Sequence, residues 1–190
     1  MISPARTDQV IWTSSDLELL SQGEGKRYEI IDGELFVTRS PHWNHQRTID
    51  NICLELNIWS RSSNLGEARS TPGIVFSDTD NVEPDLVWIS NERLKSLLDE
   101  SGHLTGAPEL VVEVLSPGKL NERRDKEAKL KLYSSQGVQE YWIVSWRLKN
   151  VEVYRRENLQ LELCATLINH DQLTSTLLPD FSCDISRFFL

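Results

Sequence analysis

Three charged residues of this sequence could together hold a divalent metal ion. Glu113 lies in the middle of an apolar, β-branched stretch, residues 109–115, which is typical of a strand buried on both faces. A carboxylate there is unfavourable unless it is paired, hydrogen-bonded or bound to a cation. Asp85 begins a second β-prone run, residues 85–89, and Lys129 lies in the helix expected after Glu113. We therefore expect Asp85 and Glu113 to be metal ligands.

Hydrolysis of a phosphodiester bond is the reaction that this set of groups would suit. Two acids on adjacent strands can share one Mg²⁺ or Mn²⁺ ion through their hard carboxylate oxygens. A lysine ammonium can position the attacking water or stabilise the charge that develops on the phosphoryl group. Asp85, Glu113 and Lys129 are thus the predicted catalytic residues. Strand alternation alone does not show whether the two acids share a face.

The helix expected over residues 121–136 should carry Lys129 on its inner side. At about 100° per residue, the apolar residues from Ala128 to Tyr133 form an arc centred close to Lys129. Asp125 lies one turn earlier on the same side, where it could orient Lys129 within the site. The alternative is an inward i,i+4 ion pair between Asp125 and Lys129, with the lysine stem packed on apolar surface.

The outer face of this helix is rich in charge. The same wheel places Arg124, Glu127 and Lys131 on the solvent side. Cations of the helix could contact phosphate groups from there, namely Arg123, Arg124, Lys126 and Lys131. A solvated helix face is the commoner reason for such a charge pattern.

Two further residues are candidates for an accessory role. Glu29 lies in the first β-prone segment and could bind the metal or a water molecule; alternatively it is a solvated hairpin acid. His45 lies near the start of a long expected helix and could meet a phosphate or assist proton transfer. The alternative for His45 is a surface or capping histidine.

The order of expected elements predicts an α/β or α+β fold around one mixed sheet flanked by helices. Asp32-Gly33 between two β-prone runs predicts an N-terminal hairpin, and the last third of the chain predicts antiparallel strands. The expected helices are a short one from Leu17 to Gly23–Gly25, then residues 43–61, 91–99, 121–136 and 185–189. The expected strands are residues 67–77, interrupted by Pro72-Gly73, then 85–89, 109–115, 138–146, 150–154 and 159–167, with a turn at 78–81.

Length and composition are those of an ordinary globular chain. The 190 residues suit one domain, with 39% hydrophobic and 26% charged residues. The formal net charge of -9 argues against tight, non-specific binding of nucleic acid, which normally needs a basic face. It leaves a metal-dependent nuclease possible, since carboxylates repel phosphate only until the cation binds.

The remaining sequence features concern compartment and assembly. The chain has no long apolar run and no secretory h-region at its start, so we expect a cytoplasmic protein. The three cysteines, Cys53, Cys164 and Cys183, have no metal or disulfide spacing and are expected to be reduced core residues. Exposed edge strands after residue 150 predict a homodimer.

Several segments, in this order, resemble one nuclease family. Pro84-Asp85 followed by Glu113 resembles the acidic part of the PD-(D/E)XK nuclease superfamily. More narrowly, the segments YEIIDGEL, VEPDLVWI, APELVVEVLSPG, DKEAKLKLYSSQGVQEYWIV and LLPDF resemble the Uma-type restriction endonuclease family, as do Ser40-Pro41 and His45. The resemblance covers about residues 25–185. It implies a restriction-endonuclease-like fold, dependence on Mg²⁺ and a DNA substrate, and it matches Glu29 to an acidic position of the family.

The sequence departs from the superfamily pattern at one position. The lysine expected two residues after the second acid is Leu115 here. In related families the lysine can come from the following helix, and Lys129 matches that position. Two other functions therefore stay open: a nuclease-fold binding or assembly module without catalysis, and a nuclease that acts on RNA or branched DNA.

Overall fold

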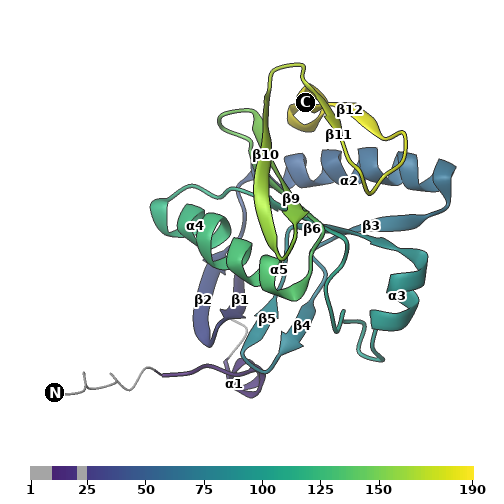
Figure 1. Ribbon diagram of the computed structural model, residues 1–190. Helices are drawn as coiled ribbons and strands as arrows, with labels where there is room; N and C mark the ends of the chain where they lie inside the picture. Colours follow the sequence, from purple (N-terminus) through teal and green to yellow (C-terminus); the bar gives the residue numbers. More distant parts are fainter. Residues whose placement is uncertain (1–9, 21–24) are drawn as a thin grey trace, which may run out of the picture.

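A six-stranded mixed sheet forms the centre of the fold in the computed structural model, which describes residues 10–20 and 25–190 (Figure 1). The strand order is β10-β9-β8-β7-β6-β3, and only β7 and β8 run parallel. The strands are β3 (Gly66–Ser70), β6 (Leu86–Ser90), β7 (Leu110–Val114), β8 (Glu140–Ser145), β9 (Asn150–Glu157) and β10 (Gln160–Ile168). The predicted mixed sheet is confirmed.

A second, four-stranded sheet contains the expected hairpin. Its order is β2 (Glu34–Arg39), β1 (Lys26–Ile31), β5 (Asp80–Val82) and β4 (Ile74–Ser77). Asp32 and Gly33 turn between β1 and β2 with φ of 52° and 75°, as a two-residue hairpin turn requires. The single strand expected over 67–77 is wrong: the break at Pro72-Gly73 divides it between the two sheets. Asp80 and Asn81, expected in a turn, begin β5.

The helices agree with the predictions except in two segments. They are α1 (Ser14–Leu19), α2 (Trp43–Ser63), α3 (Asn91–Leu97), α4 (Lys119–Arg123), the π-helix η1 (Arg124–Lys129), α5 (Leu130–Gln136) and the 3₁₀-helix η2 (Ile185–Phe189). The regular helix expected over 121–136 is thus interrupted by a π-helical stretch. The first helix ends at Leu19, where Leu20 becomes extended, so its expected end near Gly23–Gly25 is wrong; residues 23 and 24 themselves lie outside the described residues. No helix in the described part of the chain is long and apolar enough to cross a membrane.

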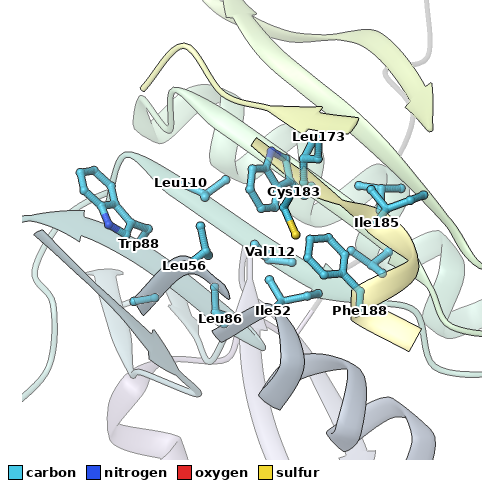
Figure 2. Close-up of a cluster of buried hydrophobic side chains, with 14 of the residues drawn as sticks. Ile52, Leu56, Leu86, Trp88, Leu110, Val112, Leu173, Cys183, Ile185 and Phe188 are labelled. Atoms are coloured by element: carbon cyan, nitrogen blue, oxygen red, sulfur yellow. The ribbon is translucent and has the colours of Figure 1, made fainter. Parts of the chain in front are cut away.

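Strand alternation divides the core between the two faces of the central sheet. Even-numbered residues of β6, β7 and β8 pack against α2 and the C-terminal segment, which includes the two-stranded sheet of β11 (Gln172–Thr174) and β12 (Ser182–Asp184). Figure 2 shows this cluster, with Ile52 and Leu56 of α2 beside Leu86, Val112 and Phe188. Odd-numbered residues such as Val87, Val111 and Ile143 pack on the other face, toward α5 and β4.

The cysteines are all free, but they do not all fill the core. Cys183 is buried, Cys53 is partly buried and Cys164 is exposed. Cys164 lies where the β9–β10 register shifts between Leu163 and Ala165, so it is the extra residue of a bulge on the outermost strand. The expectation of a core position is therefore wrong for Cys164.

Candidate active site

Asp85 and Glu113 lie together on the odd-numbered face of the central sheet. β6 and β7 pair antiparallel with Leu86 opposite Val112, and one residue further this register sets Asp85 opposite Glu113. The Oδ2 atom of Asp85 accepts a hydrogen bond of 2.8 Å from the backbone N–H of Val114. Both side chains are almost completely buried, with exposed fractions of 5% and 1%. The two acids proposed from sequence thus share one face.

Lys129 points into the same place from the π-helix. Its Nζ lies 2.8 Å from Oε1 of Glu113 and 2.8 Å from Oε1 of Glu29. The side chain is 1% exposed, so the predicted inward orientation is confirmed. Tyr133, one turn later, donates a hydrogen bond of 3.0 Å from its Oη to the same Glu113 oxygen. Among the described residues no hydrogen bond uses Oε2 of Glu113.

Glu29 is part of this cluster rather than a solvated hairpin acid. It is 2% exposed, and its Oε1 also accepts a hydrogen bond of 3.0 Å from the backbone N–H of Glu83. Lys129 lies 2.8 Å and Arg124 3.8 Å from its carboxylate oxygens, so the π-helix covers the sheet face from which Glu29 projects. The solvated interpretation is therefore wrong.

His45 is buried against Asp85. Its Nε2 lies 3.3 Å from Oδ2 of Asp85, and its Nδ1 has no hydrogen-bond partner among residues 10–20 and 25–190. The interpretation as a surface or capping histidine is wrong, since His42 caps α2 instead by accepting a hydrogen bond from the N–H of Asn44 at its Nδ1. His45 lies three residues further into α2, where the helix side faces the sheet.

The π-helix changes the orientation of Arg124. Its hydrogen bonds span five residues, so the segment before it is rotated relative to a regular helix. Arg124 is 8% exposed, with Nε 2.8 Å from Oδ1 of Asp125 and Nη1 3.8 Å from Oε2 of Glu29. The expected solvent-side position of Arg124 is therefore wrong. Asp125 is buried as expected, but it pairs with Arg124, and no Asp125–Lys129 ion pair is formed among the described residues.

The other cations of this helix face outward and are paired. Arg123 forms an ion pair with Glu127, Lys126 with Glu152, and Lys131 with Asp32. The Lys131 and Asp32 side chains are exposed, and the Arg123 and Glu127 side chains are exposed as well. These contacts favour the interpretation as a solvated, ion-paired face.

Arg27 and Tyr133 are site residues that the sequence analysis did not identify. Arg27 Nη1 lies 3.4 Å from Oδ1 of Asp85, and its Nε lies 3.2 Å from Glu83. Two simple spacings could have indicated them. Arg27 precedes Glu29 by two residues on a strand, and Tyr133 follows Lys129 by four on a helix, so each shares a face with a candidate residue.

The pKa values of the two central acids move in opposite directions. Burial raises the pKa of Glu113 to about 8: it outweighs the attraction of Lys129, and the nearby carboxylates of Asp85, Asp125 and Glu29 add to it. Burial also opposes ionisation of Asp85, but the hydrogen bond and charge of His45, the Lys129 ammonium and the Val114 N–H lower its pKa to about 2. The protein without a cation therefore holds Asp85 ionised and Glu113 protonated near neutral pH.

Lys129 keeps its charge in this cluster. Burial acts to lower the pKa of its ammonium, but the carboxylates of Glu113 and Glu29 outweigh burial and hold the pKa above its ordinary value. For Asp125, burial outweighs the attraction of Lys129 and Arg124 and raises the pKa. A deep cluster of acids is thus only partly neutralised by the cations around it.

A pocket of about 200 Å³ opens onto these groups, and Asp85, Glu113, Glu29, His45 and Lys129 all line it. In the described part of the chain, no three His, Cys, Asp or Glu side chains are placed to hold a metal ion together. The Lys129 ammonium lies between Glu29 and Glu113, which leaves Asp85 and Glu113 as the pair of hard oxygen donors. Such a pair fits Mg²⁺, which often uses one or two protein carboxylates and completes its shell with water and substrate oxygens.

The comparisons with known proteins agree with this fold. A solved structure described as a "putative nuclease belonging to DUF820" from Anabaena variabilis superposes with a TM-score of 0.73. The match covers 93% of this chain and 97% of that one, at 17% sequence identity, so it shows the fold alone. No curated protein matches the chain. A family model described as "Putative restriction endonuclease" matches residues 14–186, and the chain therefore belongs to the Uma2 family.

Proposed function

We propose that this protein is a divalent-metal-dependent endonuclease that hydrolyses phosphodiester bonds of DNA. The observation that carries the proposal is the placement of Asp85 opposite Glu113 in one pocket, with the Lys129 ammonium 2.8 Å from Glu113. Two acids on adjacent strands and one lysine are the groups that metal-assisted phosphodiester hydrolysis uses. Membership of the Uma2 family supports the same reaction class.

Asp85 and Glu113 would hold one Mg²⁺ or Mn²⁺ ion. When bound, the cation would act as a Lewis acid toward the phosphoryl group and increase the acidity of a bound water. Asp85 is already ionised and is fixed by the N–H of Val114, by His45 and by Arg27. Glu113 would lose its proton on binding, since a carboxylate must be ionised to be a good ligand.

Lys129 would stabilise the negative charge that develops on the phosphoryl oxygens or position the attacking water. Glu29 and Glu113 hold its ammonium from two sides, so the charge is oriented before the substrate arrives. Lys129 comes from the helix after β7, which accounts for the apolar Leu115 at the position where the superfamily has its lysine. Arg124 pairs with Asp125 and lies near Glu29, which adds a second cation to the same cluster.

Plasmid cleavage tests this proposal directly. Supercoiled plasmid would be incubated with Mg²⁺ or Mn²⁺ and with wild type, Asp85→Ala, Glu113→Ala or Lys129→Ala. Lys131→Ala is the matched control, because Lys131 lies on the same helix and is exposed. We expect nicking by wild type and the control, and loss of nicking in the three site variants.

The alternatives give different results in the same series. A binding or assembly module would show no cleavage of any substrate and no cation-dependent rise in melting temperature that Asp85→Ala removes. A nuclease for RNA or branched DNA would cleave those substrates while leaving the plasmid intact. Retained cleavage in Lys129→Ala alone would remove Lys129 from the mechanism and keep the two acids.

We also propose that two chains associate through β10. This strand is at the edge of the central sheet, and its exposed side chains include Leu163 and Ile168, about half exposed each. Unpaired edge strands with apolar side chains favour association. Light scattering should give the mass of a dimer, and Leu163→Lys should shift it toward the monomer. A monomeric mass for the wild type would exclude the assembly.

A further inference from the structure

The mouth of the candidate site is basic although the chain is acidic. Five of the fourteen residues that line the pocket are lysine or arginine, and three are acidic. Lys129, Arg124 and Arg27 are each paired with acids of the site. The other two are Lys26 and Arg39, which are exposed and form no ion pair within residues 10–20 and 25–190.

Lys26 and Arg39 face one another across the open end of the hairpin. They are direct partners in the β1–β2 register. Side chains at directly opposite positions have Cβ atoms roughly 5 Å apart, and like charges there destabilise the sheet. Just beyond this pair, the backbone N–H of Ser40 donates a hydrogen bond of 2.8 Å to the carbonyl of Gly25, which fixes the strand ends. The chain thus keeps two repelling cations side by side at the entrance of the pocket.

The start of α2 adds to the positive potential there. This 21-residue helix begins at Trp43, four residues after Arg39; Pro41, just before the helix, and His45, in its first turn, also line the pocket. The N-terminus of a long helix carries a partial positive charge that favours anions. Three independent sources of positive charge, from two strands and one helix, therefore meet beside the carboxylates.

We propose that Lys26 and Arg39 form a phosphate-binding subsite that takes a backbone phosphate next to the one cleaved at Asp85 and Glu113. This inference rests on the proposed function and adds the residues that position the nucleic acid. An anionic phosphate between the two side chains would relieve their repulsion. The net negative charge of the rest of the chain would repel the nucleic-acid backbone from other surfaces and favour its binding at this entrance. The helix cations Arg123, Lys126 and Lys131 are already paired with acids and contribute less.

The test measures binding separately from cleavage. Fluorescence anisotropy of a labelled DNA duplex would be recorded in Ca²⁺ over a range of salt concentrations, and a gel would check afterwards that the duplex is intact. Each phosphate contact contributes about 0.9 to the slope of log affinity against log salt. Lys26→Gln/Arg39→Gln removes the contact with one phosphate and should therefore weaken binding at low salt and lower the slope by about 0.9.

The control is matched in charge. Lys95→Gln/Lys149→Gln removes two exposed lysines that do not line the pocket, and it should leave the slope unchanged. The exchange Lys26→Arg/Arg39→Lys keeps both charges and should retain most of the binding. Equal weakening by both Gln double variants would show an effect of net charge alone and would overturn the subsite.

Thermal melting at low salt, without DNA, provides a second readout. Since the two cations repel one another, Lys26→Gln/Arg39→Gln should raise the melting temperature by about 1–3 °C. A lowered melting temperature would show that the pair supports the fold and would overturn the proposal.

The outcomes separate the subsite from the proposed function. Cleavage by wild type together with unchanged binding by Lys26→Gln/Arg39→Gln would overturn the subsite and keep the nuclease. Weakened binding by this variant without any cleavage by wild type would support the subsite while the nuclease proposal fails. No binding of DNA by wild type would overturn both.

Discussion

Asp85 and Glu113 stand opposite one another on β6 and β7, yet their pKa values lie near 2 and near 8. Two ionised carboxylates in one pocket would repel one another. The surrounding groups lower the pKa of Asp85 and raise that of Glu113, so only one of the two is ionised. His45, the Lys129 ammonium and the Val114 N–H hold Asp85 ionised, while burial holds a proton on Glu113. The pair therefore titrates as an ionised ligand and a neutral acid until a cation binds.

The stability of the cation-free protein should fall as pH rises from about 5 to 8. Between the ordinary glutamic pKa of 4.5 and the folded value of about 8, the folded state binds a proton at Glu113 that the unfolded state does not. The stabilisation is complete below 4.5 and is lost as pH passes through 8, on the order of a few kcal/mol. Urea unfolding with EDTA should show this slope in wild type and a smaller one in Glu113→Gln. Parallel curves for the two proteins would contradict the raised pKa.

Cation binding should release a proton and strengthen with pH. Glu113 must ionise to act as a ligand, so the rise in melting temperature caused by Mg²⁺ or Mn²⁺ should be larger at pH 8 than at pH 6. Asp85→Ala should abolish the rise at both values, while Glu92→Gln, an exposed acid on α3, should keep it. Calorimetry in two buffers of different ionisation enthalpy measures the released proton. A rise that is the same at pH 6 and pH 8 would argue against Glu113 as a ligand.

Replacing Lys129 by methionine should destabilise the protein as well as inactivate it. The change leaves Glu29 and Glu113 without the cation that both contact at 2.8 Å. Removing one partner of a buried ion pair typically costs about 3–5 kcal/mol, and here the loss falls mainly on Glu29, which is the ionised partner. Lys131→Met on the same helix should have little effect, since that side chain is exposed. Urea unfolding at pH 7 compares the two variants. Equal free energies of unfolding would show that the contacts of Lys129 with Glu29 and Glu113 do not stabilise the fold.

Arg124 and Arg123 are adjacent in sequence, but only the replacement of Arg124 should destabilise the protein. Arg124→Gln removes the partner of the fully buried Asp125 and of Glu29, so we expect a loss of about 3 kcal/mol in unfolding free energy. Arg123→Gln affects an exposed ion pair with Glu127 and should leave stability nearly unchanged. Denaturant unfolding of both variants gives the comparison. A larger loss of unfolding free energy in Arg123→Gln than in Arg124→Gln would indicate a regular α-helix here, with Arg124 on the solvent side, in place of the π-helix.

Sequence patterns identified the central acids because burial and charge conflict within one short segment. Glu113 stands out among branched apolar residues, and Lys129 lies at the centre of an apolar arc, so both positions followed from local rules. The family resemblance matched Glu29 to an acidic position, and its burial comes from contact with Lys129 and Arg124, which lie far along the chain from it. Long-range contacts of that kind leave no local periodicity.

The misplacement of Arg124 has a different cause. A helical wheel assumes a constant rotation per residue, and one π-helical turn breaks that assumption for every residue before it. The segment contains neither glycine nor proline, so its sequence carries none of the usual signals of an irregular helix. Lys129, at the end of the π-helix and next to regular α5, kept the expected orientation.

The C-terminal helix η2 has a consequence for the timing of folding. Phe188 is completely buried beneath α2, and Asn51 of α2 donates a hydrogen bond of 3.2 Å to its carbonyl. All candidate site residues precede residue 134, whereas the cluster that supports β6 and β7 from below is completed only when Phe188 arrives. On the ribosome, a growing chain therefore carries every candidate catalytic group for more than fifty residues of synthesis before the sheet beneath them is fully packed.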